Sequence, residues 1–297
     1  MQVLRKPDWL KIKIPSGEDY IRIKKSLQTY NLHTVCEESS CPNVSKCWES
    51  GTASIMIMGS LCTRVCKFCD VSSGRPAPLD PDEPNRVAEA IKQWNLRYIV
   101  ITSVCRDDLE DGGAAHFAKT IKSVKLSCPD TIVEPLIPDF NYDSDSIKKI
   151  IESEPEVVSH NIETVRRLSP KVRDSRATYE QSLSVLRKIK EINPKIYTKS
   201  SIMVGHGETR DEVIQAASDL KSANVDVITA GQYLQPSLNH LPVAEYVSPA
   251  KFESYQKIFE EMGFLHVVTG PFVRSSFQAA DFIDNFLNMN RLTPSQP

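Results

Sequence analysis

The sequence lacks any long apolar run and any strong excess of charge of one sign. No apolar run approaches the roughly 18 residues of a membrane span, so we expect no membrane partner. Lysine and arginine number 36 and aspartate and glutamate 38, which leaves a net charge of −2 and speaks against a nucleic-acid partner. Residues 1–17 lack the apolar stretch of a signal peptide, so we expect a cytoplasmic protein.

Segments typical of strands and of helices alternate from residue 53 onward. The expected strands lie at 53–58, 97–102, 131–136, 156–159, 195–204 and 225–229, with helices between them. Such alternation indicates parallel strands joined by right-handed crossovers, hence an α/β fold, either an open sheet or a barrel. We divide the chain into an N-terminal extension (1–52), an α/β body (53–264) and a C-terminal segment (265–297).

Polar loops follow five of the expected strands, at 59–70, 103–113, 159–164, 205–209 and 230–235. Parallel strands bring their C-terminal ends to one rim, in an open sheet and in a barrel alike. The sequence therefore predicts a site at this rim, built from several loops.

Cysteine is distributed unevenly, with six of the eight between positions 36 and 69. Disulfides would need a small exported chain, whereas clustered thiols in a reducing compartment more often bind metal or react. Of the two others, Cys128 is expected to be an ordinary buried thiol and Cys105 is in principle a further ligand.

Cys62, Cys66 and Cys69, here called the rim triad, form a C-x3-C-x2-C motif directly after the first expected strand. A zinc knuckle would need a fourth ligand from elsewhere, because structural zinc sites are normally closed by four. An iron–sulfur cluster with one uncovered iron suits three thiolates better, since the open position can bind substrate.

Cys36, Cys41 and Cys47, here called the N-terminal triad, form a C-x4-C-x5-C motif. The spacing is irregular for a zinc module. Ser39, Pro42 and neighbouring polar residues give the segment a loop-like character. As in the rim triad, the sequence offers three thiol ligands and no evident fourth cysteine to complete the site.

The rim triad, its place after the first strand and the aromatic Phe68 resemble the radical S-adenosylmethionine superfamily. That resemblance implies a partial (β/α)6 barrel with N-terminal and C-terminal extensions. It also implies a [4Fe–4S] cluster on the rim triad, whose fourth iron binds S-adenosylmethionine and whose electron splits it to methionine and a 5′-deoxyadenosyl radical.

The two triads in this order resemble the lipoyl synthase family more narrowly. Further agreement covers the segments 101–104, 106–109, 111–114, 137–140, 160–165, 231–236, 240–243 and 270–276. The resemblance implies insertion of two sulfur atoms at carbons 6 and 8 of an octanoyl chain on a lysine of a lipoyl carrier protein or domain. It also implies an electron donor such as ferredoxin or flavodoxin, and an iron–sulfur cluster carrier.

In that family a second, auxiliary [4Fe–4S] cluster sits on the N-terminal cysteines and is sacrificed as the sulfur source. The resemblance makes Ser276 its fourth ligand, with Ser275 as the alternative, and brings Arg274 close enough to pair with a substrate or cofactor carboxylate. From the residues alone, the two serines would be read as a helix N-cap. We expect the tail to fold back across the barrel mouth and both triads to lie at one rim.

The resemblance also places Asn161, Glu163 and Gly205 at S-adenosylmethionine, beside Phe68. The alternatives are helix capping for Asn161 and Glu163, and a simple turn for Gly205. Asp107 and Asp108 either orient the methionyl group or cap a helix. His160 and His240 are expected to form hydrogen bonds, because radical abstraction needs no general base.

The chain departs from the family pattern at Cys105, His206, Leu238, Asn239 and Phe277, none of which alters the six cysteines or the serine. Two other functions are considered. A different sulfur-inserting radical enzyme, such as one like biotin synthase, is disfavoured by the N-terminal triad and the Arg-Ser-Ser tail. A non-catalytic iron–sulfur or zinc carrier is disfavoured because it would need far fewer residues.

Overall fold

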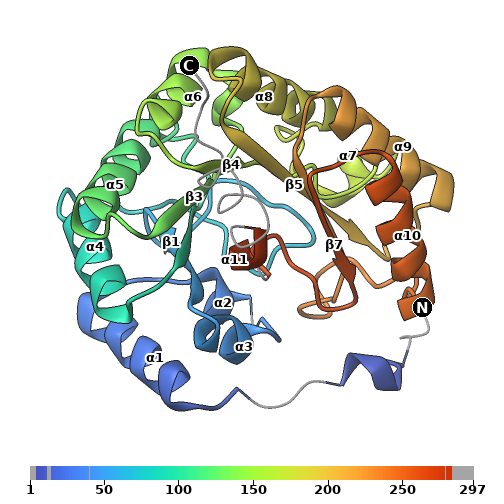
Figure 1. The fold of residues 1–297 in the computed structure, drawn as a ribbon, viewed down its shortest axis with the longest axis horizontal. Coiled ribbons are helices and arrows are strands. Elements are labelled where there is room, and N and C mark those ends of the chain that lie inside the picture. The colour runs from blue at the N-terminus through green and yellow to red at the C-terminus, as the bar shows by residue number, and fades with distance from the viewer. Residues whose placement is uncertain (1–4, 12–14, 40, 278, 283–297) are drawn as a thin grey trace, which may run out of the picture.

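A computed structural model describes residues 5–11, 15–39, 41–277 and 279–282. Seven parallel strands form one sheet in chain order. They are β1 (Thr52–Ile57), β2 (Tyr98–Ser103), β3 (Ile132–Leu136), β4 (Val157–Ser159), β5 (Tyr197–Val204), β6 (Val227–Gln232) and β7 (His266–Gly270). β1 and β7 are the two edge strands of the sheet in the described residues and do not pair with each other, so the sheet is a partial barrel with one open side (Figure 1).

The parallel α/β fold expected from the alternation is confirmed, and the structure adds a strand, β7. This strand pairs with β6 as far as Gly231 and Gly270. Only Val267 of its five residues is buried, which explains the weak apolar signal. Because β7 follows residue 264, the sheet continues into the expected C-terminal segment, of which residues 278 and 283–297 lie outside the described part.

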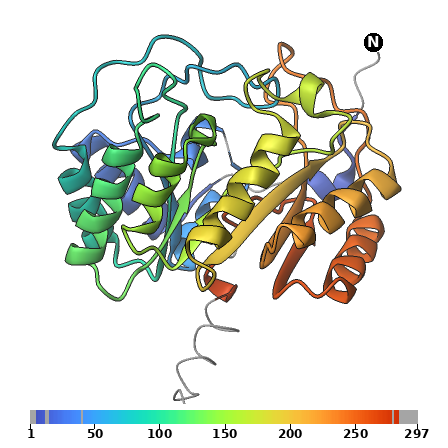
Figure 2. The same cartoon turned by 90° about the horizontal axis from the view of Figure 1, so that it is seen from above.

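Helices cover the outer face of the sheet (Figure 1). They are α4 (Glu83–Trp94), α5 (Ala114–Ser127), α6 (Ser144–Ile151), α7 (Ser169–Val172), α8 (Tyr179–Ile192), α9 (Arg210–Ser222) and α10 (Pro249–Glu261). Each crossover returns outside the sheet, so the loops after the strands gather at one rim, at the top of Figure 2. No helix in the described ranges combines the length and apolarity of a membrane span.

The inner face of the sheet carries a buried polar group rather than only apolar side chains. Lys199 on β5 lies 2.9 Å from a carboxylate oxygen of Glu134 on β3, and both side chains are nearly fully buried. Ser159 and Tyr98 also donate hydrogen bonds to Glu134. Pairing of this kind satisfies charges that would otherwise be costly to bury.

Described segments near both ends of the chain lie at the open side of the barrel (Figure 1). The N-terminal elements are η1 (Asp8–Leu10), α1 (Glu18–Tyr30), α2 (Val35–Glu38) and α3 (Val44–Glu49), and the C-terminal one is α11 (Ala279–Phe282). Helices α2 and α3 contact β1. Ala279 and Ala280 pack with Tyr98 and Ile132, at the beginnings of β2 and β3. The tail therefore runs from the end of β7 towards the N-terminal ends of the strands.

Candidate active site

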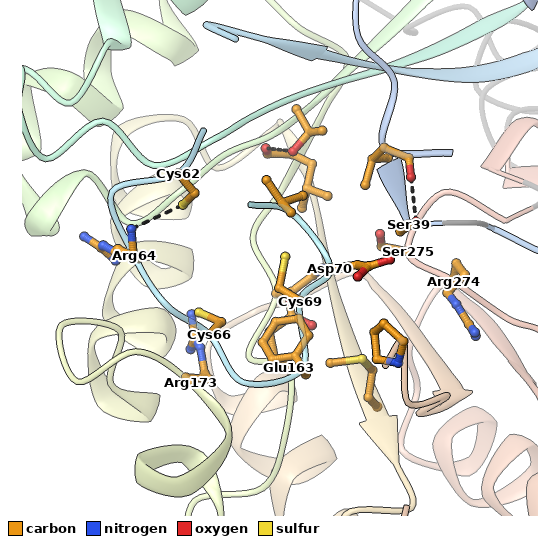
Figure 3. A pocket seen from close by; sticks show the side chains of 18 of the residues that line it. Ser39, Cys62, Arg64, Cys66, Cys69, Asp70, Glu163, Arg173, Arg274 and Ser275 are labelled. Atoms are coloured by element: carbon orange, nitrogen blue, oxygen red, sulfur yellow. Dashed lines mark hydrogen bonds between the residues drawn. The ribbon is translucent and has the colours of Figure 1, made fainter. Parts of the chain in front are cut away.

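A cavity of about 500 Å³ opens at the C-terminal ends of the strands. Its walls come from the loops after β1, β2, β3, β4 and β6, from α2 and its neighbours, and from the tail. All three sulfurs of the rim triad line it, and in Figure 3 they lie on the opposite side from Ser39, Arg274 and Ser275. The predicted convergence of several loops at this rim is thus observed for most of the loops.

Backbone amides donate hydrogen bonds to two sulfurs of the rim triad, those of Cys62 and Cys66. The N–H groups of Arg64 and Cys105 donate to Sγ of Cys62, at 3.4 and 3.3 Å. The N–H of Asp174 donates to Sγ of Cys66, at 3.4 Å. Hydrogen bonds of this type favour a thiolate and, in iron–sulfur proteins, tune the reduction potential.

The thiols of the rim triad differ in acidity. The hydrogen bond from the Cys105 side chain lowers the pKa of Cys62 to about 6. Burial raises the pKa of Cys66, and it raises the pKa of Cys69 to about 12. A metal centre binds thiolates and displaces these protons, so buried thiols of this kind are compatible with a cluster that supplies its own positive charge.

The donor set fits an iron–sulfur cluster better than a single metal ion. A structural zinc ion is normally closed by four ligands, and the rim triad supplies three thiols to the cavity. A four-iron cluster accepts thiolates at wider spacing, because each sulfur binds a different iron. Three soft thiolates therefore suit the cluster and leave one iron for another ligand.

The N-terminal triad lines a second, smaller pocket on the open side of the barrel, together with Ser276, Arg274 and Phe277. Within the triad segment, the Cys41 amide donates to the Cys36 carbonyl at 2.9 Å. Burial raises the pKa of Cys36 to about 12 and also raises that of Cys41. The tail thus brings a serine and an arginine to three cysteines more than 200 positions away in the sequence.

The position of this second pocket differs from the expectation of one shared rim. Thr52, Ala53 and Ser54, at the beginning of β1, line it, whereas the rim triad follows the end of β1. The tail likewise enters the barrel instead of crossing its mouth, because the gap between β1 and β7 leaves room for it. The two sites remain neighbours, since Val35, Ser39 and Pro42 from the N-terminal triad's segment line the large cavity.

The two tail serines face different spaces. Ser276 lines the pocket of the N-terminal triad, and Ser275 lines the large cavity. Arg274 lines both. Desolvation lowers the pKa of its guanidinium, which is opposed by the nearby Cys41 thiol, and its Nη1 donates to the carbonyl of Val273 at 2.7 Å.

Three of the four residues expected at S-adenosylmethionine line the large cavity: Phe68, Asn161 and Glu163. Burial raises the pKa of Glu163, and its backbone is left-handed with φ of 66°. Gly205 is absent from the lining. A Cβ there would lie 2.2 Å from Nε2 of Gln232, so close packing within the chain accounts for this glycine.

Other expected residues have clear partners. His160 lies between the carbonyl of Ile137 and Oγ of Ser182, both at 2.9 Å, and His240 lies 3.0 Å from the Cys69 carbonyl. Both histidines therefore form hydrogen bonds as expected. The carboxylates of Asp107 and Asp108 instead bind arginines, Arg64 and Arg106 respectively.

Sequence reasoning missed Arg173, which lines the large cavity and is 8% exposed. Its Nη1 donates to Ser182 at 2.7 Å, and its Nε has no hydrogen-bond partner. Its charge acts on both Cys66 and Glu163. No spacing rule links a lone arginine in the loop after α7 to a cysteine more than 100 positions earlier.

The structure locates four of the five residues that depart from the family pattern. Cys105 lines the large cavity beside Cys62, and Phe277 lines the N-terminal pocket under Lys46, whose Nζ is 5.2 Å from the ring centroid. His206 is buried and stacks on Tyr233 with centroids 4.2 Å apart. Leu238 is 85% exposed, so this position faces outward.

Comparison with known proteins gives matches along the whole chain. The model of the radical SAM superfamily matches residues 56–220, and that of the N-terminal domain of lipoyl synthase matches residues 1–41. Lipoyl synthase of Myxococcus xanthus is 52% identical over 95% of this chain and 94% of its own length. Lipoyl synthase of Halobacterium salinarum is 53% identical over 97% of this chain and 94% of its own length.

Some relatives are longer. The apicoplast lipoyl synthase of Plasmodium vivax is 53% identical over 97% of this chain, and the chain spans 65% of that relative's length. Among solved structures, methylornithine synthase matches with a TM-score of 0.56 at 13% identity, covering 93% of this chain and 94% of the other. The hydrogenase maturase HydG of Carboxydothermus hydrogenoformans matches with a TM-score of 0.57 at 14% identity, covering 92% of this chain and 78% of the other. These two structures support the fold alone.

Proposed function

Because this chain belongs to the lipoyl synthase family of the radical SAM superfamily, we propose that it inserts two sulfur atoms at carbons 6 and 8 of an octanoyl chain. The octanoyl chain is carried on a lysine of a lipoyl carrier protein or domain. The observation that carries the proposal is the meeting of Ser276 with the N-terminal triad, in a pocket beside the large cavity. A radical enzyme that only cleaves S-adenosylmethionine has no use for such a pocket.

Membership of the superfamily implies S-adenosylmethionine and a [4Fe–4S] cluster, which the rim triad would hold. When bound, they supply the electron and the radical that remove hydrogen from an unactivated C–H bond. The chain's own part is to bind and orient the reactants and to exclude water from the cavity.

The cavity residues suit the charged groups of S-adenosylmethionine. Arg173 presents a buried guanidinium with a free Nε, which suits the methionyl carboxylate. Glu163 and Asn161 offer oxygen acceptors close by, which suit the amino group or the ribose hydroxyls. Phe68 adds an apolar surface beside them. These contacts are the binding mode that we propose, and Gly205 is not part of it.

The octanoyl chain needs an apolar path from the rim to the N-terminal triad. Val104, Leu136, Ile137 and Met203 line the large cavity, and Val35 and Pro42 line it on the side of that triad. An apolar chain buried there is held largely by the removal of its surface from water. The reacting carbons would then lie between the two triads.

The N-terminal triad and Ser276 would hold the auxiliary [4Fe–4S] cluster that serves as the sulfur source. A serine oxygen is a hard ligand and binds iron less firmly than a soft thiolate does. The fourth ligand is therefore the one most easily released when the cluster gives up sulfur. Arg274, half-buried between both spaces, supplies a positive charge beside the anionic ligands.

The proposal includes partners that act from outside the chain. An electron donor such as ferredoxin or flavodoxin would reduce the rim cluster, and an iron–sulfur cluster carrier would rebuild the auxiliary one. We place the reaction in the cytoplasm, and we retain the division into an extension at 1–52, a barrel at 53–264 and a returning segment at 265–297.

Mass spectrometry of an octanoylated carrier domain after anaerobic turnover tests this function. The reconstituted protein should carry about eight irons, from two four-iron clusters, and the carrier should gain two sulfur atoms. Release of 5′-deoxyadenosine without sulfur gain would indicate a different radical reaction. Bound zinc, or no release of 5′-deoxyadenosine, would leave the non-catalytic carrier as the better interpretation.

A further inference from the structure

Arg64, between Cys62 and Cys66, has an unusually complete set of partners. Its side chain is 4% exposed. Nε and Nη2 donate to the carboxylate of Asp107 at 3.0 and 2.7 Å. Nη1 and Nη2 donate to the carboxylate of Asp139 at 2.6 and 2.8 Å, and Nη2 also reaches Oδ1 of Asn141 at 2.9 Å. All three nitrogens of the guanidinium thus donate to partners within the chain.

These bonds join loops that follow different strands. Arg64 belongs to the loop after β1, Asp107 to the loop after β2, and Asp139 to the loop after β3. A fourth loop enters through Arg176, whose Nη1 donates to Asp107 at 3.2 Å and whose Nη2 donates to the Thr63 carbonyl at 2.8 Å. Hydrogen bonds and ion pairs within the chain thus hold the loop of the rim triad to three neighbouring loops.

One of the fastened loops is conformationally costly. Three successive non-glycine residues in η2 (Phe140–Tyr142) have left-handed φ values of 47°, 52° and 61°. Such conformations persist where surrounding contacts over-determine them, and they concentrate at functional sites. Asn141 uses this turn to point its amide oxygen at Arg64, so the guanidinium is one of the contacts that hold the turn.

We propose that Arg64 is a positioning residue that holds the loop of the rim triad in its ligand-ready shape before a cluster is present. The inference deepens the proposed function and rests on it only for the identity of the cluster. Thiolates spread over eight positions must otherwise lose conformational freedom when the metal binds. The flat guanidinium reaches two carboxylates and an amide in different directions, which a lysine ammonium of equal charge cannot do.

Hydrogen–deuterium exchange of the metal-free protein tests the proposal without any activity. Arg64→Lys should speed exchange roughly tenfold in peptides covering 59–74 and 137–143, because the loops open locally. The matched control is Arg106→Lys. Arg106 is also a buried arginine with a bidentate carboxylate partner, Asp108. Its one further bond, from Nη1 to the Met58 carbonyl at 3.5 Å, ends just before the first peptide begins. This control should leave the two peptides unchanged.

Cluster loading provides the second readout. With iron and sulfide supplied in just the amount that two clusters need, Arg64→Lys should load about four irons per chain instead of about eight, with the N-terminal triad still filled. Retention of that cluster shows that the variant is folded. Unchanged exchange and loading in Arg64→Lys, or equal losses in Arg106→Lys, would overturn the role. Failure of the wild type to load a second cluster would count against the proposed function, while the exchange result would still decide the role of Arg64.

Discussion

The two cysteine triads are both compact in the sequence but are built in different ways. The rim triad lies on one loop, and neighbouring loops of the same rim hold that loop through the backbone and through Arg64. The N-terminal triad lies on short helical turns and is completed only when the tail arrives from residues 274–277. One site is thus a property of the barrel, whereas the other depends on joining the two ends of the chain.

This difference suits the two chemical tasks that we propose for the triads. A cluster that passes electrons and binds a cofactor repeatedly should be held rigidly by surroundings that do not change. A cluster that loses sulfur must tolerate being taken apart and rebuilt. In the proposed function one ligand of that cluster, Ser276, lies on the tail, which Asn43 contacts through a hydrogen bond from its Nδ2 to the Phe272 carbonyl.

The largest effect that would separate the triads is loss of one cluster at a time. Replacing all three cysteines of the rim triad with alanine should abolish 5′-deoxyadenosine formation, because no reductive site remains. Replacing those of the N-terminal triad should retain this activity while sulfur insertion disappears. Chromatography of 5′-deoxyadenosine and mass spectrometry of the carrier measure the two outcomes. Loss of both activities in a folded N-terminal variant would mean that the triads do not work separately.

The next largest effect concerns the tail ligand. Ser276→Ala should reduce sulfur insertion roughly 100-fold, the scale of losses on removing a group that supports a metal site, with 5′-deoxyadenosine formation changed less than twofold. Ser275→Ala is the matched control, because Ser275 faces the large cavity instead. If the two variants exchanged these phenotypes, the ligand would be Ser275.

Sequence reasoning succeeded where periodicity or a compact motif carried the information. Alternating apolar segments were sufficient for β1 to β6 because these strands are largely buried, and the close spacing of Cys62, Cys66 and Cys69 identified the rim site. Strand β7 was missed because little of it is buried. Arg173 and the partners of Arg64 were missed because their roles arise from contacts between loops, which leave no pattern in one sequence. The N-terminal triad lies on the open side of the barrel, and the spacing of the cysteines carries no information on whether the barrel is open or closed.

A smaller effect would come from disturbing the tail without touching a ligand. Gly231→Ala places a Cβ 1.9 Å from the Val273 carbonyl oxygen, so the tail must shift. Sulfur insertion should fall roughly tenfold, because displacements of about 1 Å in a reacting geometry are costly, while 5′-deoxyadenosine formation persists. Gly270→Ala is the control, since its Cβ would meet only Cγ2 of Val273 at 3.4 Å, an ordinary contact. Equal effects of the two changes would show that tail position is not what matters.

The smallest effect tests the rim triad in the metal-free protein, through the pH dependence of alkylation. The thiolate is the nucleophile, and the pKa of Cys62 is about 6 whereas that of Cys69 is about 12. At pH 7, iodoacetamide should therefore label Cys62 first, and the rate of labelling should fall as the pH drops through 6 because the thiolate becomes protonated.

A variant at Cys105 tests the cause of this acidity. The hydrogen bond from the Cys105 side chain is the main cause of the low pKa of Cys62, so Cys105→Ala should move the midpoint of the pH–rate curve upward towards the ordinary thiol value. Peptide mapping after short labelling measures each cysteine separately. Preferential labelling of Cys69, or a midpoint at Cys62 that Cys105→Ala leaves unmoved, would contradict this account of the acidity at the rim.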